Sequence, residues 1–103
     1  MSAYKAFHER SIKDPEGFWA EQAKLVEWHK PFDKVLDYNN PPFAKWYVGG
    51  KINLCHNAVD RHLATRGDQS ALIFVSTETD QEKIYTYRDL HAEVQRMAAI
   101  LQD

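Results

Sequence analysis

The run "SALIFVS" at residues 70–76 constrains the fold of this chain more than any other feature. Its apolar residues follow one another without alternation, which predicts a short strand buried on both faces. The polar turn "TETDQEK" and a second strand, "IYTY", follow, so Ala71 to Tyr87 is expected to form a hairpin. A chain of 103 residues is long enough for one modest core.

A helix is expected directly after the hairpin. Thr86 is its predicted N-cap, and Asp89 is the partner in a capping box. Apolar residues then recur at helical spacing, at Leu90, Val94, Met97 and Leu101. No glycine ends this helix before Asp103. A lone hairpin beside a one-sided helix makes a poor independent fold, so we expect the chain to be a piece of a larger protein.

The first half of the chain predicts two helices and an arm. Residues 4–12 have the spacing of a short amphipathic helix. Asp14 and Pro15 are typical of a helix start, and a second helix is expected from Pro15 to about Trp28, ahead of Pro31. Residues 32–43, "FDKVLDYNNPPF", are expected to form an ordered but irregular arm, because the proline pair excludes a helix.

The stretch "KWYVGGKINLCHNAVDRHL" at residues 45–63 concentrates the candidate functional residues. Residues 46–48 are expected to be extended, and Gly49–Gly50 to form a turn. Asn53 is the predicted N-cap of a helix from Leu54 to about Thr65, which Gly67 ends. The apolar stripe of this helix consists of Cys55, Val59 and Leu63.

The residue types of this stretch raise three kinds of reactive site. A phosphate loop needs GxxxxGK[ST], but position 45 is Lys and Ile52 follows Gly50–Lys51, so a turn is the better interpretation. A zinc site from Cys55, His56 and His62 would lack paired ligands at short spacing. A Cys55–His62 nucleophile pair would lack an orienting third group. We therefore assign no catalytic residue, no cofactor-binding residue and no metal ligand.

A structural clamp is the simpler interpretation of the same residues. Asn57 and Arg61 are four residues apart, so they meet on one helix face. Their amide and guanidinium groups could satisfy the backbone of an irregular segment such as the Pro41–Pro42 arm.

Composition narrows the function classes. A net charge of −2 gives no basic field for nucleic acid, and no apolar run is long enough to span a membrane. The single Cys55 excludes an internal disulfide, and residues 1–5 lack the apolar core of a secretory signal. A cytoplasmic location is expected.

The ordered segments resemble a known family. "WYVGGKINLCHNAVDRH" is similar to the N-terminal signature of AMP-forming short-chain acyl-CoA synthetases, the acetyl-/propionyl-CoA synthetase family. The matching positions are Trp46, Gly50, Asn53, Asn57, Asp60, Arg61 and His62. "DPEGFWAEQAKLVEWHKPF" and the hairpin segment resemble flanking parts of the same family. The segments look closest to propionyl-CoA synthetase, with acetyl-CoA synthetase as the nearest competitor.

The resemblance implies an α+β fold at the start of an adenylate-forming enzyme. Residues 1–66 would form a helical and irregular N-terminal cap, and residues 67–103 the first hairpin and helix of the AMP-binding large domain. The parent would use ATP, Mg²⁺ and CoA to convert propionate into propionyl-CoA through an acyl-adenylate. The phosphate loop and the lysine of that chemistry have no counterpart here, so the resemblance implies a structural, inactive fragment whose partner is the remainder of the enzyme.

Two other functions stay open at this point. The chain could be a free-standing interaction module whose aromatic arm docks a partner, which a stop codon after Asp103 would favour. It could also be a small metal-binding regulator, which would require stoichiometric zinc in the purified protein.

Overall fold

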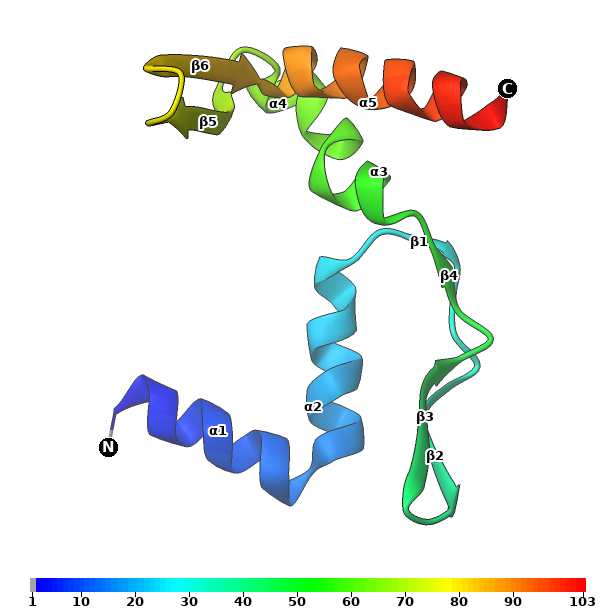
Figure 1. Cartoon of the computed structure of the whole chain (residues 1–103). Coiled ribbons are helices and arrows are strands. Elements are labelled where there is room, and N and C mark those ends of the chain that lie inside the picture. Colours follow the sequence, from blue (N-terminus) through cyan, green and yellow to red (C-terminus); the bar gives the residue numbers. More distant parts are fainter. Residues whose placement is uncertain (1) are drawn as a thin grey trace. The chain divides into compact units, whose positions relative to one another are not determined.

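The computed structural model describes residues 2–103 as helices and small antiparallel strand pairs (Figure 1). The chain divides after Asn53 into two compact units, the second being Leu54–Asp103. The predicted α+β class is confirmed. Within residues 2–103, no helix combines the length and apolar character needed to cross a bilayer.

The first unit begins with two helices joined at Asp14. Helix α1 (Ala3–Lys13) starts at Ser2, whose hydroxyl accepts a hydrogen bond from the Lys5 amide. The Asp14 amide then donates to the Arg10 carbonyl, while the Asp14 carboxylate accepts from the Gly17 amide at 3.1 Å. One residue therefore ends α1 and starts α2 (Pro15–Gln22), as the predicted N-cap requires.

The second helix is shorter than predicted. After α2 only a 3-10 turn, η1 (Ala23–Leu25), continues the helical path, and Trp28 begins strand β1 (Trp28–Lys30). This strand pairs antiparallel with β4 (Lys51–Ile52), which comes much later in the chain. The Trp28 indole N–H donates to the Ala23 carbonyl at 2.9 Å, so it satisfies a carbonyl at the helix end.

The arm is a hairpin, so the expectation of an irregular segment is wrong. Strand β2 (Lys34–Asn40) pairs antiparallel with β3 (Phe43–Val48), and Pro41–Pro42, joined by a cis peptide, forms the turn. The prolines lie outside the hydrogen-bonded ladder, where their missing N–H groups cost nothing. The proline pair therefore excludes a helix without excluding strands on either side.

Two clusters of aromatic rings pack within the first unit. Phe18 is only 3% exposed, and its ring packs edge-on against Phe7 and Trp19 with centroid separations of 4.8 and 5.0 Å. A second cluster joins Trp28, Phe32 and Tyr47, with centroids 5.1 to 5.3 Å apart.

The second unit starts with a broken helix rather than the single one predicted for residues 54–65. Helix α3 (Leu54–Ala58) is followed by a 3-10 turn, η2 (Asp60–His62), and by the short α4 (Leu63–Arg66). The break is at Val59, whose backbone leaves helical geometry (φ −125°, ψ −64°) while its side chain becomes buried. Gly67 does end α4, although its φ of −54° is not left-handed.

The hairpin and final helix agree with the sequence. Strands β5 (Ser70–Ser76) and β6 (Gln81–Thr86) pair antiparallel, and α5 (Tyr87–Gln102) follows at once. The Thr86 hydroxyl accepts from the Asp89 amide and the Asp89 carboxylate accepts from the Thr86 amide, both at 3.1 Å, which confirms the capping box. Two backbone bonds, Tyr87 to Gln69 and Arg88 to Gly67, hold the helix start against the loop before β5.

Burial of the hairpin on both faces is not observed. Ala71 is half-buried, but exposure lies between 47% at Leu72 and 63% at Val75 over the four large apolar residues of the run. The only helix of this unit long enough to cover the sheet, α5, follows β6 directly, and one helix cannot cover two faces. On α5 itself Leu90 and Val94 are half-buried, whereas Met97 and Leu101 are exposed.

Candidate functional site

The stretch of residues 45–63 runs through both units, so each half is described within its own unit. In the first unit Tyr47 is the central residue. Its hydroxyl donates to the Trp19 carbonyl at 2.8 Å, and its ring packs on Trp28 and Phe32. These contacts fasten β3 to α2 and to the segment that follows α2.

Tyr47 holds an unusual backbone conformation, with φ at +49°. A bulky residue in the left-handed region costs about 1–3 kcal/mol, which its surroundings must offset. Burial raises the pKa of the Tyr47 phenol above its usual 10.0, so the hydroxyl stays protonated at neutral pH and can donate its hydrogen bond. Both observations fit a fastening role.

A small apolar cavity lies beside this tyrosine. Trp19, Trp46 and Tyr47 line it, and its volume is about 310 Å³. The Trp19 and Trp46 rings lie 6.2 Å apart and edge-on, and 40% and 46% of these residues remain exposed. Its walls are aromatic rings, which favours an apolar contact.

The Gly49–Gly50 pair forms a turn, as predicted. The Gly50 amide donates to the Tyr47 carbonyl at 3.0 Å, and Gly49 has a φ of +81°. A Cβ on Gly49 would lie 2.4 Å from a carboxylate oxygen of Asp33. The Gly50 amide is thus already used, and a carboxylate lies against Gly49, so this turn does not fit a phosphate group.

In the second unit, Asn57 and Arg61 meet as their spacing predicts. The Arg61 guanidinium donates to the Asn57 side-chain oxygen at 3.3 Å. Helix α3 begins at Leu54, directly after the predicted cap Asn53. The capping bond of Asn53 and the packing of Asn57 and Arg61 on the Pro41–Pro42 turn remain predictions.

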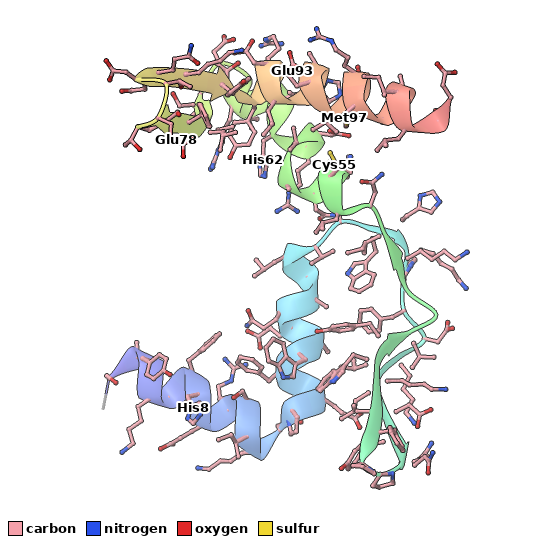
Figure 2. All side chains as sticks on the ribbon, viewed as in Figure 1. His8, Cys55, His62, Glu78, Glu93 and Met97 are labelled. Atoms are coloured by element: carbon pink, nitrogen blue, oxygen red, sulfur yellow. The ribbon has the colours of Figure 1, made fainter. Side chains whose placement is uncertain are left out.

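The structure places Cys55 and His62 against different neighbours. The Cys55 sulfur lies 4.0 Å from the Asp60 carboxylate, while the His62 ring packs on Tyr87 with centroids 5.4 Å apart. An activated cysteine needs a cationic or basic neighbour, and Asp60 carries the opposite charge. Figure 2 labels Cys55 on α3 and His62 in the following turn.

His91 was missed by the sequence analysis as a neighbour of this segment. Its Nε2 lies 3.9 Å from the same Asp60 oxygen, and the two side chains are about one-third exposed. The contact joins α5 to η2, and no short-range sequence signal connects residues so far apart. Among residues 2–103 no three His, Cys, Asp or Glu side chains gather as metal ligands would.

Comparison with known proteins gives the family. The model "Acetyl-coenzyme A synthetase N-terminus" matches residues 4–58, more than half of the chain. The chain belongs to this family. Its resemblance to acetyl-CoA-synthetase-type ligases is thereby confirmed.

Relatives extend the match over nearly the whole chain. The chain is 49% identical to a propionate–CoA ligase of Escherichia coli over 97% of its length, and 50% identical to one of Salmonella typhimurium over 96%. It is also 50% identical to an acetyl-coenzyme A synthetase of Bdellovibrio bacteriovorus. A solved acetoacetyl-CoA synthetase from Streptomyces lividans matches 99% of the chain at 30% identity, with a TM-score of 0.83. The chain spans 16% of the length of each of these proteins.

Proposed function

We propose that this chain is the N-terminal portion of a propionate–CoA ligase. The enzyme would join propionate to ATP, releasing pyrophosphate, and CoA would then displace AMP from the acyl-adenylate to give propionyl-CoA. The supporting observation is the 49–50% identity to two propionate–CoA ligases along almost the entire chain. Acetate is the second candidate acid, because an acetyl-coenzyme A synthetase is equally similar at 50% identity.

The role of the chain within that enzyme would be structural. Three residues of the stretch 45–63 support this role: Tyr47 bonds to the Trp19 carbonyl, and Arg61 bonds to Asn57. Residues 1–66 would form the N-terminal cap, and residues 67–103 would begin the AMP-binding large domain. The partner of the chain would be the remainder of the enzyme, with no nucleic acid or membrane involved, in the cytoplasm.

ATP, Mg²⁺ and CoA would be held by that remainder. The Gly49–Gly50 turn does not fit a phosphate group. The Gly50 amide is already bonded to the Tyr47 carbonyl, and the negative charge of the Asp33 carboxylate lies beside Gly49. No catalytic, cofactor-binding or metal-ligating role is therefore assigned to a residue of this chain.

The choice between propionate and acetate is tested on the full-length protein that the reading frame encodes. ATP–pyrophosphate exchange should run faster with propionate than with acetate at equal concentrations. Faster exchange with acetate would replace the first candidate by the second, and exchange with neither acid would contradict the proposal.

The structural role is tested on the chain of 103 residues itself. Incubated with ATP, Mg²⁺, CoA and propionate, it should release no AMP above a protein-free control. Sustained AMP release, removed by depleting the chain from the sample, would show that it carries reactive groups after all.

A further inference from the structure

The two strands of the second-unit hairpin have opposite character. Strand β5 carries an unbroken apolar run from Ala71 to Val75, whereas β6 begins with Gln81, Glu82 and Lys83. An unbroken apolar run is typical of a strand with neighbours on both sides, and charged residues are typical of a strand at the sheet edge. The composition therefore predicts a central position for β5 and an edge position for β6.

In the structure β5 does not have the two neighbouring strands that a central strand would have. Within residues 2–103, β5 and β6 pair only with each other, so the outer edge of each strand has no strand beside it. Leu72 and Phe74 point to one face and are 47% and 48% exposed; Ile73 and Val75 point to the other and are 59% and 63% exposed. An isolated apolar strand with an open edge is a template for pairing.

The outer side of β6 is already adapted to water. Lys83 lies across from Phe74, and its ammonium group sits 4.6 Å from the centroid of the Tyr85 ring. Glu82, across from Val75, places a carboxylate on the other face of the same strand. Charges on both faces of β6 make the addition of a strand there costly, because each charge would lose water.

We propose that the open edge of β5 pairs with one further strand, supplied by the polypeptide that follows residue 103 in the full protein, while β6 stays at the sheet edge. The inference rests on the proposed function, which requires that polypeptide. The relatives are about six times longer than this chain, and the solved acetoacetyl-CoA synthetase contains the same fold as 16% of its length. The partner strand is expected to be rich in Val, Ile, Leu or Phe, to match the two apolar faces of β5.

Hydrogen exchange with residue resolution tests the proposal, comparing the full protein with the chain of 103 residues. In the full protein, the β5 amides that point away from β6 should exchange on the order of a hundredfold more slowly than in the short chain, because a paired amide exchanges only through opening. The outward amides of β6 serve as the matched control and should exchange at similar rates in both.

Several outcomes would overturn the proposal. Slowing at β6 instead of β5, or at neither strand, would place the new strand elsewhere. The exchange of the β5 amides could also slow in the chain of 103 residues as its concentration rises, until it matches the full protein. That result would show that a second copy of the chain pairs with β5. A reading frame that ends at residue 103 would encode no further strand to pair with β5, which would also contradict the proposal.

The same preparation separates this inference from the proposed ligase activity. A protein that catalyses ATP–pyrophosphate exchange but leaves its β5 amides unprotected would support the ligase function and contradict the pairing of β5 with a further strand. A protein that protects its β5 amides but shows no exchange with either acid would support the pairing of β5 and contradict the ligase function.

Discussion

At the scale of single residues, the Tyr47 hydroxyl is the polar contact whose removal is most informative. We expect Tyr47→Phe to lower the free energy of unfolding of the first unit by about 0.5–1.5 kcal/mol, because the hydrogen bond between the Tyr47 hydroxyl and the Trp19 carbonyl is lost. Urea unfolding followed by tryptophan fluorescence measures the change. Tyr38→Phe, at a position 52% exposed on β2, is the matched control. An equal loss of unfolding free energy in both variants would show that the Tyr47 hydroxyl does not stabilise the contact between β3 and α2.

The same hydroxyl predicts a dependence on alkaline pH. The folded-state pKa of Tyr47 is raised above the unfolded value of 10.0, so its contribution is complete below pH 10.0 and is lost as pH rises through the folded pKa. Unfolding of the first unit should therefore become easier above pH 10.0, and less so in Tyr47→Phe. Identical alkaline profiles for the two proteins would contradict this.

Gly49 offers a backbone test of the turn. We expect Gly49→Ala to destabilise the first unit by at least about 1 kcal/mol, since the residue has a φ of +81° and a new Cβ would meet the Asp33 carboxylate at 2.4 Å. The double variant with Asp33→Ala removes the clash but keeps the strained φ. Thermal unfolding should show partial recovery in the double variant, and full stability of the single variant would refute the turn geometry.

At the scale of elements, the start of α5 depends on its cap. Thr86→Ala should reduce the free energy of unfolding of the second unit by about 1 kcal/mol, because the Asp89 amide loses its acceptor. Thr86→Ser keeps a hydroxyl and should retain most of the stability. Far-UV circular dichroism during urea unfolding gives both values, and equal losses for Ala and Ser would rule out capping.

Acid should weaken the same helix start. The Thr86 amide holds the pKa of Asp89 below its usual 3.8, so the contribution of Asp89 is present above the unfolded pKa and is lost as pH falls through the folded pKa. The helical signal of Asp89→Asn should therefore change less than that of the unmodified chain below pH 3.8. An Asp103→Asn control should titrate like the unmodified chain.

The elements that the sequence predicts well are those with signals inside the element. Asp14, Thr86 and Asp89 mark helix starts through contacts with residues three positions away, and the structure places the helices there. The β5–β6 hairpin is equally local, since its strands are joined by a short polar turn.

The elements that were missed depend on contacts far apart in the chain. Trp28 continues the helical pattern of α2, yet it pairs with Ile52 in a strand. Val59 lies on the apolar stripe of a predicted helix, yet the backbone breaks there, and the Asp60–His91 contact on one side of that break comes from α5. The clamp residues could be placed from spacing alone at Asn57–Arg61, but the central role of Tyr47 appears only once α2, β1 and β3 are in place.

At the scale of the whole molecule, many large apolar side chains of the chain are exposed to solvent. In the second unit, large apolar side chains are exposed on β5, β6 and α5: Leu72, Ile73, Phe74, Val75, Ile84, Met97, Ile100 and Leu101. Large contiguous apolar patches are rare on monomeric proteins, and neighbouring exposed side chains such as Leu72 to Val75 favour association. We therefore expect the isolated chain to self-associate, with a sedimentation coefficient that rises with concentration.

Substituting the end of α5 tests the cause of that association. Met97→Lys with Leu101→Lys removes two exposed apolar side chains, 58% and 79% accessible, from a helix whose cap is untouched. Association should weaken severalfold in sedimentation equilibrium while the helical content is retained, because exposed positions tolerate lysine at little cost to stability. Leu54→Lys, at a residue 76% exposed outside α5 and the hairpin, is the matched control and should leave association unchanged. A monomeric chain that melts sharply without any substitution would mean that these faces need no covering, which would also remove the physical reason for a strand beside β5.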